Sequence, residues 1–280
     1  FPRFVGTDGT RARDANDLEA GNLRFKLKAQ PTQQLTLGLS TWISRADYGA
    51  PNTGDTNRFH TSTVDEPSSV DYNVYALNVE SFMDGNGDGT GDFEGLMRRL
   101  DYLESLGIDA IWVGPFQVSP HRDHGYDIAD YYEVDKRYGT NGDFVEFMQQ
   151  ADSRGIRVIM DLVVNHTSDR HEWFRAAVSD EESRHREWYV WCEKRPKKMH
   201  QGMVFPGVQK ATWTRHPKAG AYYFHRFYEF QPDLNMDNPE VRTEVRRIMG
   251  FWLQLGVSGF RVDAVPFILE ESPDGRGRRK

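Results

Sequence analysis

The sequence is poor in cysteine and has no long apolar run. Its single cysteine, Cys192, excludes an internal disulfide framework and a structural zinc site built on several cysteines. No uninterrupted apolar stretch approaches the roughly 20 residues that a membrane-spanning helix requires. Positive charge is in slight deficit, since 35 Lys and Arg stand against 42 Asp and Glu for a net charge of -7. This balance argues against nucleic acid or an anionic membrane surface as a partner.

The composition that is present is typical of a globular protein. Of the 280 residues, 38% are hydrophobic and 28% are charged, which is enough apolar material for a sizeable core and too much charge for a fibrous chain. Residues 1–20 contain no apolar leader, and together with the single cysteine this predicts residence in the cytoplasm. Because the chain begins with Phe1 and ends on a polar tail, we expect both ends to be cut from a longer frame.

The organisation of the chain changes near residue 73. Residues 1–72 are rich in Thr, Asp, Asn, Gly, Ser and Pro, and they predict an extension or linker with one strand at 33–43 and a loop from Tyr48 to Asp71. From residue 73 onward, short apolar runs alternate with runs of helical spacing. These patterns predict strands at 74–79, 110–115, 157–164 and 257–264, and helices at 92–106, 141–154 (capped by Asn141) and 239–255 (capped by Asn238).

Apolar strands that alternate with helices predict an α/β fold with a parallel sheet covered on both faces. The first intervals between strands match the roughly 30 residues of a βαβ unit. The last interval is much longer, and its excess, residues 168–235, predicts an inserted lobe rich in Trp, Tyr and Phe. We therefore expect three segments after the extension: 73–167, the lobe at 168–235, and a continuation at 236–280.

A first polar cluster follows the first predicted strand. Residues 84–92 alternate oxygen-bearing side chains with glycines, as a calcium loop requires. Counted from Asp84, the stretch matches positions 1, 3, 5, 6 and 9 of an EF-hand loop, but position 12 is Gly95 rather than a bidentate Glu. A strand, not a long helix, precedes it. The sequence therefore predicts a calcium-type loop that is not an EF-hand, with a metal-free Gly/Asp turn as the alternative.

Two further clusters lie at the ends of the next two predicted strands, where parallel sheets usually bind ligands. Residues 123–127 follow the second strand and contain a histidine, a tyrosine and two aspartates; an ordinary polar loop is the alternative. Asp161 lies inside the apolar third strand, where an unpaired acid is costly. His166 comes just after that strand, and a structural histidine is the alternative to a functional one.

A last cluster lies on the fourth predicted strand. Arg261 and Asp263 are two residues apart, so their side chains point to the same face. A nearby guanidinium keeps a carboxylate ionised, and an oriented, ionised carboxylate is a suitable covalent nucleophile. A buried structural ion pair is the alternative.

These clusters, in this order, resemble those of glycoside hydrolase family 13, the α-amylase family, over about residues 73–272. Residues 161–166 resemble the first motif region of the family and 259–264 its nucleophile region. Residues 231–235 resemble the motif that ends the inserted lobe, in the form typical of the oligo-1,6-glucosidase and trehalose synthase branch. Two aromatic stretches of the lobe are most similar to trehalose synthases, namely 187–191 and 220–227.

The resemblance implies a (β/α)8 TIM barrel, of which about the first four βα units are present, with the lobe inserted after strand three. It also implies roles for five residues. Asp263 matches the catalytic nucleophile and Arg261 the arginine that supports it. His166 matches a histidine that contacts the sugar, Tyr126 the aromatic platform for that sugar, and Asp123 an acid that closes the pocket of exo-acting members.

The implied ligand is an α-linked glucose disaccharide or a short α-glucan, and the implied cofactor is Ca2+. The implied activity is that of a retaining α-glucoside-active enzyme, most like a trehalose synthase that interconverts maltose and trehalose by intramolecular glucosyl transfer. The residues of the loop that match calcium ligands are Asp84, Asn86, Asp88, Asp92 and the carbonyl of Thr90.

The sequence also departs from the family pattern. The acid/base Glu after strand five and the third acid after strand seven have no counterpart, because the sequence ends soon after Asp263, and Glu270 and Glu271 match no such motif. Retaining chemistry requires a proton donor about 5–5.5 Å from the nucleophile. We therefore expect an amino-terminal part of a family member that is inactive alone. An α-glucosidase or oligo-1,6-glucosidase hydrolase and a non-catalytic carbohydrate-binding half-barrel are the alternatives.

Overall fold

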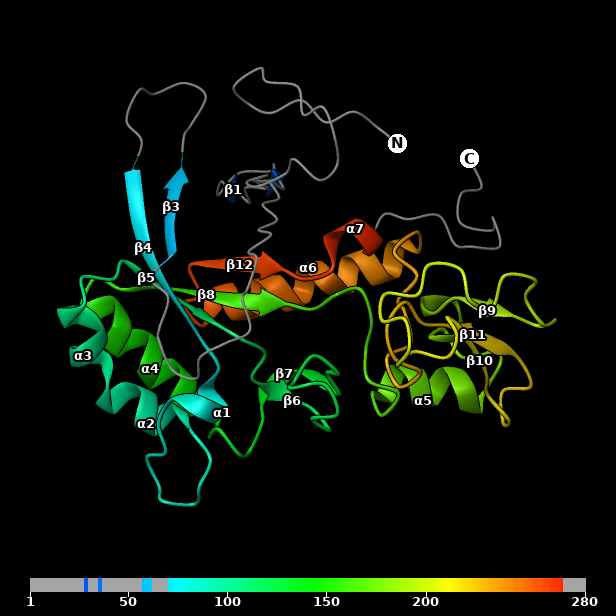
Figure 1. Ribbon diagram of the computed structural model, residues 1–280, viewed down its shortest axis with the longest axis horizontal. Helices are drawn as coiled ribbons and strands as arrows, with labels where there is room; N and C mark the ends of the chain where they lie inside the picture. Colours follow the sequence, from blue (N-terminus) through cyan, green and yellow to red (C-terminus); the bar gives the residue numbers. More distant parts are fainter. Residues whose placement is uncertain (1–27, 30–34, 37–56, 62–69, 269–280) are drawn as a thin grey trace. The chain divides into compact units, whose positions relative to one another are not determined.

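The protein is described by a computed structural model that covers residues 28–29, 35–36, 57–61 and 70–268 (Figure 1). The chain divides into two compact units, Phe1–Thr53 and Gly54–Lys280. In the first unit, strand β1 (Lys28–Ala29) pairs antiparallel with β2 (Leu35–Thr36). Most of the strand predicted at 33–43 lies outside the described residues.

The second unit is built on a five-stranded sheet with the order β12-β8-β5-β4-β3. Four of these strands are parallel and adjacent in chain order, as predicted: β4 (Val70–Leu77), β5 (Ala110–Val113), β8 (Arg157–Leu162) and β12 (Gly259–Val262). Neighbouring strands that follow one another along the chain are the arrangement of a parallel barrel. The register places Ala110 beside Arg157, and Gly259 beside Ile159.

The edge of the sheet next to β4 differs from the prediction. Strand β3 (Asn57–Thr61) pairs antiparallel with β4, although the sequence predicted a loop from Tyr48 to Asp71. Strand β4 begins at Val70 rather than at residue 74, so the boundary predicted at residue 72 falls inside this strand. The polar and turn-forming residues of this stretch give no strand signal by themselves, because the backbone ladder with a distant partner defines the pairing.

The helices α4 (Asn141–Ser153) and α6 (Pro239–Gln254) confirm two predicted helices. Asn238 caps α6 as expected, since its side chain accepts a hydrogen bond from the Glu240 amide at 2.8 Å. The cap of α4 is Thr140 rather than Asn141, because Thr140 and Asp143 form a reciprocal capping box. The Asn141 side chain is instead bonded to the backbone of β7 (Asp130–Val134).

The helix predicted over 92–106 is two short helices, α2 (Phe93–Arg98) and α3 (Leu100–Ser105). They are separated at Arg99, whose ψ of 5° departs from helical values. Asp92 caps α2 by accepting a hydrogen bond from the Gly95 amide at 2.6 Å. The apolar spacing predicted the buried face correctly, because a single break does not change which side of the helices packs inward.

An aromatic cluster joins the helices to the sheet. The Phe116 ring, just after β5, stacks on Phe144 of α4 at 5.0 Å and meets Trp252 of α6 edge-on at 5.2 Å. Phe93 of α2 lies edge-on to Phe116 at 5.4 Å. The indole nitrogen of Trp252 donates to the Tyr131 carbonyl at 2.8 Å, which satisfies its polar atom inside the core. This cluster fixes the segment that leads into the loop after β5.

The inserted segment between β8 and α6 forms a lobe with its own small antiparallel sheet, in the order β10-β11-β9. Figure 1 shows these strands, in yellow and gold, on the side toward which β8 runs. The elements of the lobe are α5 (Glu172–Ser179), the 3-10 helix at Arg186–Trp188, β9 (Trp191–Cys192), β10 (Trp213–Arg215) and β11 (Tyr222–Phe224).

Three short elements complete the described structure, and the sequence signalled none of them. They are α1 (Val79–Phe82), the strand β6 (Gln117–Val118) that pairs with β7, and α7 (Val265–Ile268). No helix in the described part of the chain is both long and apolar enough to cross a membrane.

Candidate active site

Arg261 holds two carboxylates at the carboxyl end of the parallel sheet. Its Nη1 atom lies 3.0 Å from Asp161 Oδ1 and 2.6 Å from Asp263 Oδ1. The parallel register places Arg261 directly beside Asp161 of the neighbouring strand, so the two side chains share one face. The two strand-end clusters that the sequence predicted separately are therefore one ionic cluster.

The two carboxylates of this cluster differ in exposure. The side chain of Asp161 is fully buried, whereas that of Asp263 is 18% exposed. Both oxygens of Asp161 are occupied, one by Arg261 and the other by the Tyr126 hydroxyl, which donates to Oδ2 at 2.9 Å. Asp263 is therefore the carboxylate that a ligand can reach, and Asp161 serves to hold its neighbours.

Burial raises the pKa of Asp161 to about 6; the Arg261 guanidinium opposes this rise and the Asp263 carboxylate adds to it. For Arg261, burial disfavours the charged form, but the Asp161 and Asp263 carboxylates outweigh it and leave the pKa above its ordinary value. The guanidinium carbon also lies 5.0 Å from the centre of the Trp112 ring, a cation–π contact. Arg261 thus stays charged and fixed beside the nucleophile candidate.

His166 and Tyr126 contact each other next to the ionic cluster of Arg261 and its carboxylates. The His166 Nε2 atom is 3.1 Å from the Tyr126 carbonyl, and because a carbonyl only accepts, Nε2 carries the proton. Nδ1 is then the acceptor, 3.4 Å from the side-chain amide nitrogen of Asn165. Burial lowers the pKa of His166, so the ring is neutral. Phe227 of the lobe meets the imidazole edge-on at 5.3 Å.

Asp123 links the loop after β6 to the end of the lobe. Its carboxylate accepts a hydrogen bond from Gln231 Nε2 at 2.8 Å. Within the loop, the Tyr126 amide donates to the Asp123 carbonyl at 2.8 Å. The five predicted site residues therefore gather at one end of the sheet, and the catalytic and binding role of each stays a prediction.

Backbone strain marks the same region. Among the residues that the structure describes, three that are not glycine adopt the left-handed conformation, namely His121 (φ 56°), His124 (φ 48°) and Ala264 (φ 55°). Two of them lie in the loop that carries Tyr126, and the third directly follows Asp263. At Gly125 (φ 94°) a Cβ atom would come within 2.8 Å of the Pro115 carbonyl oxygen, so only glycine fits. Conformations of this kind concentrate at functional sites, where the surroundings hold them in place.

Sequence reasoning gave no role to three residues of the site. Asp161 carried a signal, the cost of an acid inside an apolar strand, but its partners Tyr126 and Arg261 could not be read from the sequence. Trp112 and Gln231 gave no separate signal, since one lies in an apolar strand and the other within a motif. Their contacts with Arg261 and Asp123 are long-range.

The calcium-type loop is closed by its own backbone amides. Its acceptors are side-chain oxygens: those of Asp84 accept from Gly87 and Gly89, Asn86 accepts from Asp88, Asp88 from Thr90, and Asp92 from Gly85, Asn86 and Gly95. The backbone amides of Gly89 and Gly87 lower the pKa of Asp84 and keep it ionised.

The donor chemistry of this loop fits a hard cation, since its candidate ligands are oxygen atoms of carboxylate, amide and carbonyl groups. Among the residues that the structure describes, no three His, Cys, Asp or Glu side chains are gathered as a metal site. Asp92 is buried and faces the amides that begin α2. The part of the loop from Asp84 to Thr90 is exposed or half-buried, and it is therefore the part that could take a cation.

Comparison with known proteins places this geometry in a family. Residues 76–279 match the sequence model of the α-amylase catalytic domain. The chain is 49% identical over 197 residues to a trehalose synthase of Thermus thermophilus, and the aligned part covers 70% of this chain and 20% of that protein. It is 44% identical over 195 residues to an oligo-1,6-glucosidase of Heyndrickxia coagulans, with coverage of 69% and 35%.

A solved structure agrees with these matches. The crystal structure of Bacillus licheniformis trehalose-6-phosphate hydrolase superposes with a TM-score of 0.67 at 40% identity, and the match covers 72% of this chain and 38% of the hydrolase. The chain thus spans between about a fifth and two fifths of the length of these relatives.

The chain belongs to the α-amylase family, glycoside hydrolase family 13. Its sheet is part of the (β/α)8 barrel of that family, so the predicted fold class is confirmed. Its relatives are glycosidases and trehalose synthases, which agrees with an enzyme of this class.

Proposed function

We propose that the chain supplies the nucleophile and the sugar-binding face of a retaining α-glucoside-active enzyme, most like a trehalose synthase. The observation that carries this proposal is the pairing of a partly exposed carboxylate, Asp263, with Arg261 at the sheet end where Tyr126 and His166 gather. The similarity to a trehalose synthase at 49% identity supports the choice of branch. The expected ligand is an α-linked glucose disaccharide or a short α-glucan.

The chemistry of such a site proceeds in two steps. A carboxylate oxygen of Asp263 attacks the anomeric carbon of the glucosyl unit, the bond to the leaving oxygen breaks, and that oxygen takes up a proton. An acceptor hydroxyl then attacks the same carbon, loses its proton and releases Asp263, with net retention. Arg261 keeps Asp263 ionised and oriented, and Asp161 holds Arg261 in place by accepting a hydrogen bond from the same guanidinium nitrogen. Trehalose forms when the acceptor is the anomeric hydroxyl of the released glucose.

The first step requires a proton donor for the leaving group. Asp161 has a pKa of about 6, but it cannot serve, because its side chain is buried and both oxygens are occupied. Asp263 is itself the nucleophile candidate. We therefore expect the 280-residue chain alone to show no turnover of maltose or of an aryl α-glucoside.

We also propose that the loop at 84–92 binds Ca2+ through oxygens of Asp84, Asn86 and Asp88 and the Thr90 carbonyl, with Asp92 closing the loop. A cation there would neutralise carboxylates that lie close together along the sequence of the loop. It would also join the segment after α1 to the start of α2, since Asp92 bonds to both sides of the loop.

A glucosyl donor that needs no proton tests the nucleophile directly. Fluoride leaves α-D-glucosyl fluoride without general acid catalysis, so the 280-residue chain should form the covalent intermediate even without a donor. We expect acid-quenched protein to carry one hexosyl unit, located by peptide mass spectrometry at Asp263. The D263N variant, matched in size, should carry none. No label on the parent chain, with maltose binding also absent, would overturn the proposal.

Hydrolysis is a second candidate, because an oligo-1,6-glucosidase and a trehalose-6-phosphate hydrolase are also similar to this chain. The two activities differ only in the acceptor of the second step, water or glucose. On a longer form of the protein, trehalose as the product from maltose would favour the synthase, and glucose alone would favour the hydrolase. Maltose binding without glucosylation of Asp263 would instead favour a non-catalytic carbohydrate-binding half-barrel.

A further inference from the structure

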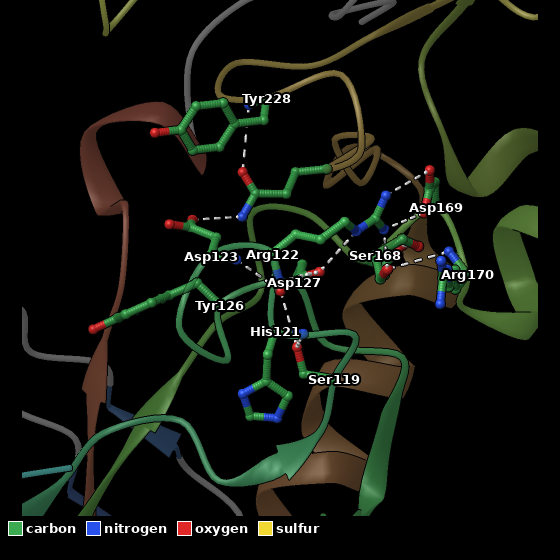
Figure 2. Close-up of polar contacts among 12 residues, drawn as sticks. Ser119, His121, Arg122, Asp123, Tyr126, Asp127, Ser168, Asp169, Arg170 and Tyr228 are labelled. Carbon is green, nitrogen blue, oxygen red and sulfur yellow. Dashed lines mark hydrogen bonds and ion pairs between the residues drawn. The ribbon is translucent and has the colours of Figure 1, made fainter. Parts of the chain in front are cut away.

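One arginine ties the loop at residues 119–127 to the inserted lobe. The Nε atom of Arg122 lies 3.3 Å from Asp127 Oδ2, on its own loop. The two Nη atoms donate to both carboxylate oxygens of Asp169, in the lobe, and Nη2 also donates to Ser168 Oγ at 3.0 Å. Figure 2 shows the guanidinium between these partners. The planar guanidinium can bond to one carboxylate in bidentate fashion and contact a second from its Nε edge, a fixed geometry that a lysine ammonium does not provide.

The carboxylate on the loop side organises the loop itself. Asp127 is fully buried and accepts hydrogen bonds from the Ser119 hydroxyl at 2.9 Å and from the Asp123 amide at 3.3 Å. The amide of Arg122 lies 3.4 Å from its other oxygen. A buried carboxylate that orients several donors depends on a cation to offset its desolvation, and Arg122 is that cation.

The carboxylate on the lobe side lies where the lobe begins and ends, a region we call the neck (residues 167–169 and 230–232). The Asp169 amide donates to the Phe230 carbonyl at 2.9 Å, and the Thr167 amide donates to the Pro232 carbonyl at 3.1 Å. The guanidinium carbon of Arg122 lies 4.4 Å from the centre of the Phe230 ring. Arg122 therefore contacts both the entering and the returning segment of the lobe.

We propose that Arg122 is a positioning residue that sets sugar affinity by fixing Asp123 and Tyr126 against the neck of the lobe. Asp123 receives its hydrogen bond from Gln231, at the returning end of the neck, so its carboxylate is oriented only while loop and neck stay together. Tyr126 reaches Asp161 across the sheet end from the same loop. This role of Arg122 rests on the proposed sugar site.

The first test needs no activity. Hydrogen–deuterium exchange of the 280-residue chain reports whether Arg122 orders the loop, because the amides of Arg122 and Asp123 donate to Asp127. In R122M we expect exchange in residues 121–127 to accelerate by about tenfold or more, as for amides whose local opening is made easier. The control R154M removes a surface pair with Asp101 and should leave this segment unchanged. Unchanged exchange in R122M would overturn the proposal.

The second test separates positioning from stability. By calorimetry with maltose, R122M should bind about tenfold more weakly than the parent chain, and D169N, which keeps the loop-side contact, should lose less. R122K restores the positive charge beside Asp127 but not the fork or the stacking on Phe230. We expect it to recover thermal stability while the maltose affinity stays low. If affinity and stability recover together in R122K, Arg122 is only a structural charge and the proposal is wrong.

The two proposals fail in different ways. If the parent chain binds no maltose and takes no label from glucosyl fluoride, the proposed function is wrong, and the exchange of residues 121–127 still decides whether Arg122 orders the loop. If the parent chain binds maltose and R122M binds it equally well, the sugar site stands and the role of Arg122 is overturned.

Discussion

The acidic side chains at the sheet end and those in the loop at 84–92 differ in the groups that hydrogen-bond them. At the sheet end, Asp161 is buried and its partners are side chains, the guanidinium of Arg261 and the hydroxyl of Tyr126. In the loop at 84–92, Asp88 is exposed, Asp84 is half-buried and Asp92 is buried, and the partners of all three are backbone amides.

The difference follows from solvation. Asp161 loses its water inside the sheet, and Arg261 of the neighbouring strand supplies the cation that offsets this cost. Asp92 is also buried, but backbone amides at the start of α2 hold its carboxylate. Exposed carboxylates keep their water and can share a cation taken from solution. The sheet end therefore carries its own cation, whereas the loop at 84–92 offers oxygen ligands that could take one from solution.

The largest expected effect on stability comes from removing the Arg261 guanidinium. R261M leaves the buried Asp161 carboxylate without its ionic partner, and we expect the free energy of unfolding to fall by about 4 kcal/mol. Urea denaturation measures this. The control R154M breaks an exposed pair with Asp101 and should change stability by less than about 1 kcal/mol. The double variant R261M/D161N should recover part of the loss; if it recovers nothing, the ionic pairing is not the cause.

The next effect is the pH dependence of the buried acid. The pKa of Asp161 in the folded protein, about 6, lies above its ordinary value of 3.8, so the folded state binds more protons between these pH values. Its contribution to stability is present below about pH 4 and is lost as pH rises through 6, by roughly 3 kcal/mol. We expect the parent chain to lose stability relative to D161N across this window. A difference between parent and D161N that does not vary from pH 4 to 7 would contradict this assignment.

The smallest effect concerns the exposed loop. Saturating Ca2+, at a hundredfold excess over its dissociation constant, should raise the free energy of unfolding by about 2.7 kcal/mol if one ion binds only the folded state. The measurement is thermal unfolding with Ca2+ against EGTA. D84N/D88N should abolish the gain, and D101N, outside the loop, should keep it. An equal Ca2+ response in D84N/D88N and the parent chain would exclude the loop as the binding site.

Much of the fold could be predicted because its signals are local. The apolar runs placed the parallel strands within a few residues of β4, β5, β8 and β12, and helical spacing placed α4 and α6. The cap of α4 was less accessible, because it depends on which side-chain oxygen reaches a free amide. The break at Arg99 was missed because it is a change of backbone conformation that leaves the apolar spacing unaltered. The pairing of β3 with β4 was missed, since a strand defined by its partner has no apolar pattern of its own.

The features of the candidate site also divide into those that the sequence predicted and those that only the tertiary structure decided. The types and spacing of residues determined that Asp161, Arg261 and Asp263 stand at strand ends, because strand geometry and chain direction fix where a residue falls along a sheet. Only the tertiary structure decided which groups meet there: Tyr126 with Asp161 across 35 residues, and Asp123 with Gln231 across 108. Such contacts depend on how the lobe packs against the sheet end, and packing is a property of the whole chain rather than of any segment.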